Sequence, residues 1–142
     1  MPHLEIVAEH HRDSAPAWQR LQDAIDGFNV ETTGARDYAP CAIYLRDAEG
    51  RDRGGVTGHA WGGWLHVTVL WVDADLRRAG HGTRLLRAAE EFARARGCRG
   101  VFLETFTFQA PEFYPRHGYE VFGRIDDYPP GHAQLFLRKR LA

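Results

Sequence analysis

A glycine-rich turn flanked by arginines, Arg77 to Thr83, has the sequence RRAGHGT and is the first candidate for a functional site in this chain. An alternating apolar segment that ends at Val72 precedes the turn and predicts a strand. Apolar residues at helical spacing from Leu85 onward predict a helix after it. The first N–H groups of a helix have no partner inside the helix, so a glycine turn that opens into one can bind an anion. The sequence therefore predicts an anion site at this turn.

Three glycine motifs are known for this kind of place. A P-loop requires G-x-x-x-x-G-K-[ST], and no lysine follows Gly80 or Gly82. The dinucleotide fingerprint requires a third glycine where Leu85 stands, and the strands before the turn look antiparallel. The pattern that remains is R-x-x-G-x-G, formed by Arg77, Gly80 and Gly82. A helix-start turn that binds nothing is the alternative for a pattern this short.

A second pattern lies downstream, in the segment FYPRHGYE at 113–120, with Ala110 four residues before Tyr114. The two patterns, in this order and separated by a helix and a strand, resemble the GNAT superfamily of acyl-CoA-dependent N-acetyltransferases, in its small bacterial single-domain type. The resemblance covers 41–141, and the residues before it match in layout only. One departure is Thr107, where the family often has an asparagine that contacts the pantetheine arm; Gln109 is the substitute that the sequence offers.

The resemblance implies that acetyl-CoA is the co-substrate and that its pyrophosphate lies on the glycine turn. It places the thioester where two parallel strands separate, with a backbone N–H near Val72 polarising the carbonyl. The residues that it assigns to cofactor binding are Leu70, Trp71, Val72, Arg77, Arg78, Ala79, Gly80, His81, Gly82, Thr83, Gln109 and Ala110.

Two residues are the catalytic candidates. The resemblance implies that Tyr114 protonates the departing thiolate, a nearly balanced transfer because a phenol and an alkyl thiol have similar pKa values. An aromatic side chain packed on the cofactor or the core is the alternative for Tyr114. Glu104 ends a strand beside the cleft and is the candidate general base, directly or through water. Strand alternation leaves open whether the Glu104 side chain faces the cleft or the solvent. If it faces the solvent, water alone deprotonates the amine.

The acceptor amine is expected on the side opposite the cofactor, between the loops at 30–40 and 126–132. The second loop carries adjacent carboxylates, an aromatic residue and two prolines that stiffen it. Acidic groups beside aromatic rings suit a small cationic amine, although an ordinary polar turn would have the same composition. The acceptor candidates are Tyr38, Trp64, Asp126, Asp127 and Tyr128.

The strands and helices that carry these groups can be predicted from the residue pattern along the chain. Alternation predicts strands at 4–8, 41–46, 56–61, up to 72, 101–106, 119–125 and 134–141. Helices are predicted after a cap at Ser14, with Trp18, Leu21, Ile25 and Phe28 pointing inward, and after the glycine turn, with a short helical segment at 111–117. A loop is expected at 30–40. The fold class is α+β: a mixed, mostly antiparallel sheet of six to seven strands, with one parallel strand–helix–strand unit and flanking helices.

Bulk properties narrow the function further. At 142 residues, a single domain over 1–142 is expected, and 44% hydrophobic with 26% charged residues is typical of a soluble protein. The net charge of −1 gives no general attraction to nucleic acid or to a membrane. A cytoplasmic location is expected because no signal peptide or membrane span is evident. Cys41 and Cys98 are expected to be buried thiols, and the eight histidines, including the neighbours His10 and His11, show no metal-ligand spacing.

These inferences converge on an N-acetyltransferase that moves an acetyl group from acetyl-CoA, by direct attack, to a primary amine of a small cationic molecule or of a peptide or protein. The alternative from another class is an acyl-CoA-binding or regulatory module that keeps the fold without catalysis. A nucleic-acid-binding helix that carries Arg84, Arg87 and Arg94 is disfavoured, because a solvated charged face explains these residues. The partners expected are coenzyme A and the acceptor amine, and a homodimer is left open.

Overall fold

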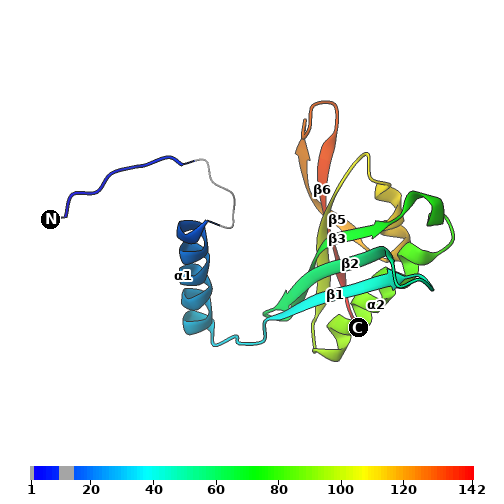
Figure 1. The fold of residues 1–142 in the computed structure, drawn as a ribbon, viewed down its shortest axis with the longest axis horizontal. Coiled ribbons are helices and arrows are strands. Elements are labelled where there is room, and N and C mark those ends of the chain that lie inside the picture. The colour runs from blue at the N-terminus through cyan, green and yellow to red at the C-terminus, as the bar shows by residue number, and fades with distance from the viewer. Residues whose placement is uncertain (1, 10–14) are drawn as a thin grey trace. The chain divides into compact units, whose positions relative to one another are not determined.

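The structure is a computed structural model that describes residues 2–9 and 15–142. The contacts divide the chain into two compact units, Met1–Arg36 and Asp37–Ala142. The first contains one helix, and the second contains the whole sheet (Figure 1). His10, His11 and the expected cap at Ser14 lie outside the described residues. A single domain over the whole chain remains a prediction.

The helix of the first unit is α1, Pro16–Thr33, which begins after Ala15 and ends at Gly34 in the left-handed conformation. Proline at the first position suits a helix start because its missing N–H would have no partner there. The helix continues four residues into the loop predicted from residue 30, because Val30 to Thr33 keep helical hydrogen bonding and only Gly34 adopts the positive φ of 73° that ends it.

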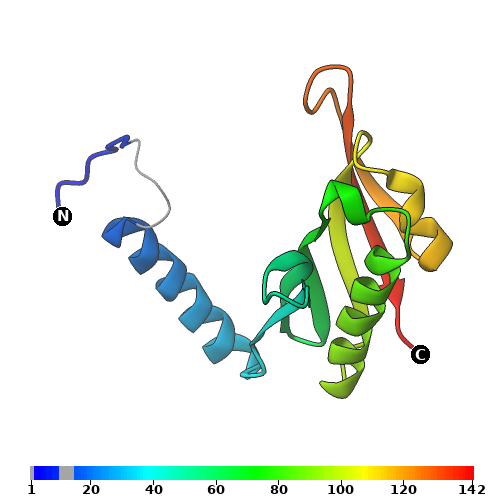
Figure 2. The same ribbon diagram turned by 45° about the vertical axis from the view of Figure 1, so that its right-hand side comes forward.

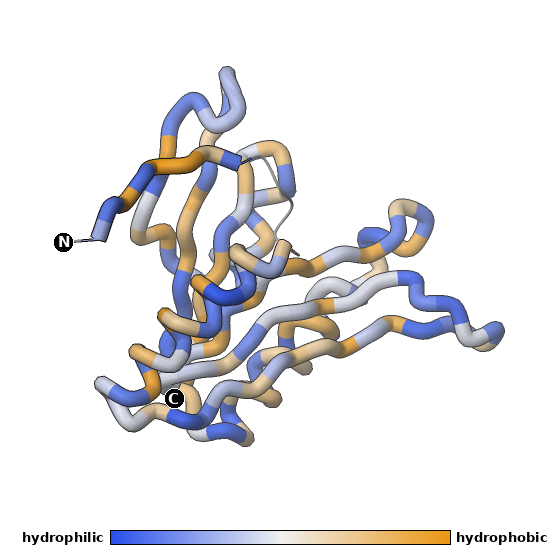
Figure 3. The backbone as a smooth tube through the Cα atoms, turned by 60° about the vertical axis from the view of Figure 1, so that its left-hand side comes forward, coloured by the Kyte–Doolittle hydropathy of each residue, from blue (hydrophilic) through white to orange (hydrophobic). Residues whose placement is uncertain are grey.

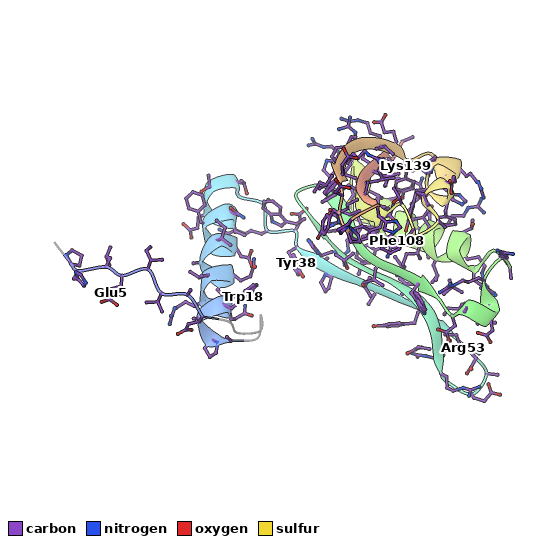
Figure 4. The ribbon with its side chains drawn as sticks, turned by 90° about the horizontal axis from the view of Figure 1, so that it is seen from above. Glu5, Trp18, Tyr38, Arg53, Phe108 and Lys139 are labelled. Carbon is purple, nitrogen blue, oxygen red and sulfur yellow. The ribbon has the colours of Figure 1, made fainter. Side chains whose placement is uncertain are left out.

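The apolar residues of α1 form the stripe that the sequence predicts, and nothing in the described part of the first unit covers their side chains. Trp18, Leu21, Ile25 and Phe28 are all at least half exposed, and Figure 4 shows Trp18 projecting from the helix. Figure 3 shows hydrophobic and hydrophilic residues interleaved along this segment, as in an amphipathic helix. Inward packing was expected from the stripe alone. Within 2–9 and 15–36 no other helix or strand is described that could cover it.

The prediction of a strand at 4–8 is wrong, because residues 2–9 form no strand. Alternation of Leu4, Ile6 and Ala8 supplies a strand-like pattern, but a strand also needs a neighbour to satisfy its N–H and C=O groups. In the described part of the first unit there is no such neighbour.

The second unit is built on a six-stranded sheet in the order β1-β2-β3-β4-β6-β5. The strands are β1 Ala39–Arg46, β2 Asp52–Trp61, β3 Trp64–Val72, β4 Gly100–Phe106, β5 Glu120–Asp126 and β6 Ala133–Arg140. Only β3 and β4 pair in parallel, and the other neighbours are antiparallel. The predicted α+β class and mixed sheet are therefore confirmed. The β2 strand begins earlier than the predicted 56–61, because Gly54 and Gly55 have no Cβ at places where one would lie within 3 Å of a carbonyl oxygen of the neighbouring strand.

One helix, α2 at His81–Ala95, crosses from β3 to β4 and covers one face of this sheet (Figure 2). Its buried side chains are Leu85, Leu86, Ala89, Glu90 and Ala93, at the spacing of one helical face. They pack on alternate residues of the strands, including Val56, Leu65, Val101, Leu103 and Leu137, which are at most 1% exposed. Full burial of a leucine or valine contributes about 1.5–3 kcal/mol relative to leaving it exposed. This core holds the strand–turn–helix unit that carries the predicted anion site.

Three short 3₁₀ segments shape the ends of the strands. They are η1 at Ala74–Leu76, η2 at Pro111–Phe113 and η3 at Pro115–His117. The last two replace the predicted helical segment at 111–117. Among the described residues, no helix is both long and apolar enough to cross a membrane. Cys41 and Cys98 are buried thiols, as expected.

Candidate active site

The site forms where two parallel strands separate. β3 and β4 are paired from Trp64 opposite Gly100 to Val67 opposite Leu103, and the pairing stops there. On the other side of β3, the register with β2 shifts after Gly58, so that Thr68 is an extra residue in β3. The ends of β3 and β4 diverge beyond this point and leave a cavity of about 650 Å³ between them. We call it the strand cleft; it is lined by Thr68, Val69, Leu70, Trp71, Val72, Arg77, Glu104, Thr105, Phe108, Gln109, Ala110 and Tyr114.

A second cavity, of about 670 Å³, lies at the start of α2. We call it the helix-start cavity. It shares Leu70, Val72, Arg77, Gln109, Ala110 and Tyr114 with the strand cleft. Its other lining residues are Leu76, Arg78, Gly80, His81, Gly82, Thr83, Glu112, Phe113 and Arg116. The two cavities therefore meet, with Tyr114 at their junction.

Every predicted cofactor residue except Ala79 lines at least one of these cavities. The turn adopts the conformation that glycine favours, since Gly80 has φ 84° and precedes α2 without a side-chain cap. The N–H groups of the first turn of α2 are thus available to an anion, and the positive end of the helix dipole adds to the attraction. A pyrophosphate fits this part of the helix-start cavity, with Arg78 and Arg116 lining its wall.

Arg77 occupies a different place from Arg78. Its guanidinium stacks over the Trp71 ring at 4.5 Å, and its Nε donates to the Val72 carbonyl at 2.9 Å. Arg77 thereby joins the end of β3 to the turn and lines both cavities. It can serve a phosphate as a cation, but its Nε already bonds the backbone.

The carboxylates after β3 hold the same turn. Arg53 donates through Nε to Asp73 at 2.8 Å and through a second nitrogen to Asp75 at 2.7 Å. The Arg53 bond, assisted by the Trp71 indole N–H, lowers the pKa of Asp73 below its usual value. Figure 4 shows Arg53 near the hairpin that joins β1 and β2. These aspartates are turn residues, as their position after a strand predicts, and they are not among the residues that line either cavity.

The substitution at Thr107 is explained by its contacts. The Thr107 hydroxyl accepts a hydrogen bond from the Ala133 N–H at 3.1 Å and so ties the end of β4 to β6. Gln109 lines both cavities, and its side-chain carbonyl accepts from the Phe106 N–H at 3.0 Å. That bond fixes the side chain and leaves the amide nitrogen as its donor. Gln109 therefore lines the two cavities with a free amide donor, whereas Thr107 lines neither, and the contact of Gln109 with a pantetheine arm remains a prediction.

Tyr114 is the buried aromatic residue at the junction. Its ring is 9% exposed and packs against Phe113 and Tyr119. Desolvation by this burial raises the pKa of the phenol above its usual 10.0, so the hydroxyl keeps its proton at neutral pH. The hydroxyl makes no hydrogen bond to another described residue, and its oxygen is not fully buried. A protonated phenol at the junction can donate to an atom in either cavity.

The segment that carries Tyr114 is anchored behind the site. The Tyr119 hydroxyl donates to Glu90 of α2 at 2.8 Å, and the Lys139 ammonium contacts the same carboxylate at 3.0 Å. Glu90 is 4% exposed, and such a carboxylate is stable in a core only when it is paired and hydrogen-bonded. Burial and the bond to Glu90 together raise the pKa of Tyr119 well above its usual range. Lys139 belongs to β6 and is labelled in Figure 4.

Glu104 lines the strand cleft, which answers the orientation question that strand alternation left open. It is the first residue of β4 beyond the paired region, on the face opposite α2. Its two carboxylate oxygens each lie 2.9 Å from His66 Nε2. A carboxylate and a phenol therefore line one cavity, as a base and an acid for group transfer would.

The acceptor candidates are only partly brought together. Tyr128 packs edge-on against Phe106, whose ring stacks on Phe108 at 5.2 Å, and Phe108 lines the strand cleft. Phe108 is labelled in Figure 4 and is about half exposed. Asp126 is paired with Arg124 at 2.6 Å, and neither Asp126 nor Asp127 lines the cleft.

The other two candidates lie on the face of the sheet opposite α2. Tyr38 stacks on His59 at 5.8 Å, and Trp64 contacts Phe102 at the start of β3, the end away from the cleft. Neither lines the strand cleft. Tyr128 does not line the strand cleft either, and Tyr38, Trp64, Asp126, Asp127 and Tyr128 all remain predictions as acceptor residues.

Sequence reasoning missed several lining residues, for different reasons. Thr68 and Val69 line the cleft because the register of β3 on β2 shifts beside them, and no residue pattern predicts this shift. Arg116 and Phe113 border the helix-start cavity from the 3₁₀ segments, and they stand within the FYPRHGYE motif, where a helical reading could have found them. His66 contacts Glu104 across two strands, and only the register of β3 on β4 reveals this.

Comparisons with known proteins agree with this geometry. The sequence model of the acetyltransferase (GNAT) family matches residues 4–119. The blasticidin-S acetyltransferase of Streptomyces morookaense is 47% identical over 142 residues, covering 99% of this chain and 98% of the relative. The crystal structure of an acetyltransferase from Bacillus cereus has a TM-score of 0.81 and 35% identity, with 94% of this chain and 98% of that chain covered. An Agrobacterium tumefaciens crystal structure of the same kind reaches a TM-score of 0.91 at 30% identity, covering 97% and 100%.

Proposed function

We propose that this chain, which belongs to the acetyltransferase (GNAT) family, transfers an acetyl group from acetyl-CoA to a primary amine of a small cationic molecule. The observation that carries this proposal is the junction of the two cavities at Tyr114. One cavity ends at a helix start suited to pyrophosphate, and the other contains the carboxylate of Glu104. Acetyltransferases of this family use acetyl-CoA, and the residues present fit that ligand.

The roles of the residues follow from where they lie. The helix-start turn and Arg78 would bind the pyrophosphate, and Gln109 would contact the arm that leads to the thioester. Bound acetyl-CoA supplies an activated acyl group. Glu104 accepts a proton from the acceptor ammonium, directly or through water, because only the neutral amine has a lone pair to attack.

The departing thiolate also needs a proton, and we assign its donation to Tyr114. The nitrogen–carbon bond forms as the carbon–sulfur bond breaks, and the sulfur takes a proton from the Tyr114 hydroxyl. The nitrogen loses one further proton, and exchange with solvent restores the phenol. Burial raises the pKa of Tyr114, which keeps the phenol protonated until this transfer.

The chemistry of the cleft supports a cationic acceptor. Its lining includes one carboxylate, Glu104, and the half-exposed ring of Phe108, whereas the Trp71 ring is already covered by the Arg77 guanidinium, the cation of this lining. A cation gains both from a nearby carboxylate and from the face of an aromatic ring. The acceptor named for the Streptomyces morookaense relative, blasticidin S, is for this reason the first to test.

The experiment is to measure thiol release from acetyl-CoA by the purified protein with blasticidin S and with matched cationic, neutral and anionic primary amines. We expect turnover that depends on the amine, an acetylated product by mass spectrometry, and a higher kcat/KM for cationic amines. Binding of coenzyme A in calorimetry without transfer to any amine would instead favour the alternative, a non-catalytic acyl-CoA-binding or regulatory module. A preference for anionic amines would contradict the proposed acceptor class.

A further inference from the structure

We propose that His66 is a positioning residue for the acetyl transfer: it holds and orients the carboxylate of Glu104 as the base for the acceptor amine. This inference rests on the proposed function and names a residue outside the cavity lining. The two side chains are each about one-quarter exposed and come from neighbouring parallel strands, His66 from β3 and Glu104 from β4.

The hydrogen bond defines which atom carries the proton. His66 Nε2 lies 2.9 Å from both Oε1 and Oε2 of Glu104. An ionised carboxylate only accepts hydrogen bonds, so Nε2 must carry the hydrogen. His66 therefore donates to Glu104 whether the imidazole is neutral or charged, and this bond fixes the direction in which the carboxylate points.

The His66 ring is itself held in place. It stacks on Phe102 of β4 at 4.3 Å with an angle of 9° between the planes, and it meets the edge of His59 of β2 at 5.4 Å. Each of these contacts joins residues that the sheet register places opposite one another. The donor is thus fixed by the sheet and cannot turn away without losing two ring contacts.

The charged and titratable neighbours on this face are few and accounted for. From β2, His59 faces the ring, and burial, followed by the charge of His66, lowers the pKa of His59 and so favours its neutral form. From β6, Arg138 stands opposite Phe102 and is paired with Glu120, while Phe136 stands opposite Glu104. Glu104 is the carboxylate that His66 contacts among the described residues.

The position of the pair explains why His66 acts through Glu104. Glu104 lines the strand cleft together with Tyr114, and His66 is not among the lining residues. The pairing of β3 with β4 ends one residue beyond His66, so Glu104 lies at the mouth of the diverging strands and is no longer held by that ladder. The side-chain bond to His66 takes over the role of fixing its orientation at the point where the backbone separates.

The test compares His66→Phe with His66→Gln and measures single-turnover rate constants. Phenylalanine keeps a ring for stacking on Phe102 but has no donor, whereas the glutamine amide can donate from a place near that of Nε2. We expect about a tenfold loss or more in His66→Phe for a strongly basic acceptor, as removal of a hydrogen bond to a charged group typically costs. His66→Gln should recover to within about threefold of wild type, and the KM for acetyl-CoA should not change in either variant.

The acceptor supplies a second readout. An amine whose ammonium pKa is near 10 needs a base at neutral pH, whereas one with a pKa near 8 already carries a substantial neutral fraction. The loss in His66→Phe should therefore be smaller for the weaker amine. Misfolding would lower both rates equally and would change the melting temperature. His59→Phe is the matched control, since it keeps a ring beside His66 and removes only an imidazole that makes no contact with Glu104, and its rate should stay within about twofold of wild type.

Failure of this inference can be told from failure of the proposed function. Absence of transfer by the wild type would overturn the proposed function and this assignment together. An active wild type with Glu104→Gln unchanged would remove Glu104 as the base, and His66 with it. Loss in Glu104→Gln with His66→Phe unchanged, an equal loss for both amines, or a His66→Gln as slow as His66→Phe, would overturn the role of His66 alone.

Discussion

At the scale of the residue, Tyr114 shows how burial prepares a group for one direction of proton transfer. The phenol is almost enclosed by aromatic rings, and burial raises its pKa above 10.0. A group with a raised pKa is fully protonated below its ordinary value and loses the proton only as the pH rises beyond it. Tyr114 thus holds its proton at neutral pH, as the proton donor proposed here must, and the raised pKa means that the proton leaves only when a strong base such as a thiolate takes it.

This leads to a prediction for Tyr114→Phe, which keeps the ring and removes the proton. We expect kcat to fall by about 10²-fold, the usual contribution of a general acid, with little change in the affinity for coenzyme A. In the wild type, any loss of kcat that comes from Tyr114 ionisation should occur above pH 10.0, and the variant should lack it. Rate constants across the alkaline range, measured by stopped flow, test both points. Unchanged kcat with chemistry rate-limiting would return Tyr114 to a packing role.

At the scale of the element, the start of α2 makes the anion site through the backbone. Gly80 adopts a positive φ, and no side chain caps the helix, so the N–H groups of the first turn are left to a ligand. Gly82 lines the helix-start cavity, and a Cβ added there would lie 3.5 Å from the Phe113 ring, an ordinary contact distance. One added carbon is therefore compatible with the fold, whereas the two methyl groups of valine would extend beyond it toward Phe113 or into the cavity.

We predict that Gly82→Val weakens coenzyme A binding by about tenfold or more, because overpacking of a filled site costs on the order of 1–3 kcal/mol. Gly82→Ala is the matched control and should bind more tightly than the valine variant. Titration calorimetry gives both affinities, and the melting temperature without ligand shows whether each variant is folded. The shift in melting temperature with coenzyme A should shrink in the same order, since a ligand stabilises the state that it binds. Equal affinities in all three proteins would place the ligand elsewhere.

At the scale of the whole molecule, the distribution of apolar surface is uneven. α2 buries one apolar side in the core of the second unit, while the stripe of α1 that contains Trp18, Leu21, Ile25 and Phe28 has no covering element in the described part of the first unit. Apolar surface of this kind commonly marks a contact with another protein. A second copy of this chain is the partner that we predict, in line with the homodimer that the sequence left open.

Sedimentation velocity over a range of protein concentrations tests this prediction. We expect a dimer in the wild type and a shift toward monomer in the double variant Leu21→Asp with Ile25→Asp, because unpaired carboxylates are costly to bury. Arg20→Asp changes the net charge by the same two units at an exposed position of α1 outside the stripe, and it should remain dimeric. A wild type that is monomeric at every concentration would contradict the prediction.

Secondary-structure elements that depend on the pattern of neighbouring residues could be predicted from the sequence. The strand–glycine–helix order from Val72 to Leu85, the apolar face of α2 and most strand positions follow from periodicity and from the conformations that glycine allows. The residues of the two cavities were largely identified as well, because the backbone N–H groups and Tyr114 belong to short contiguous motifs. Local pattern could not decide the strand expected at 4–8, whose formation requires a partner strand.

The orientation and contacts of side chains on different strands depend on how those strands are aligned, and this alignment is visible only in the folded protein. The face of β4 that Glu104 occupies, its bond to His66 and the extra residue at Thr68 all follow from how β2, β3 and β4 are aligned, and a shift by one residue would reverse each side chain. In the same way, Asp126 is paired with Arg124 and does not line the cleft, although its loop has the composition of an acidic site. Composition names the groups available to a site, whereas the sheet register and the separation of its parallel strands select those that meet.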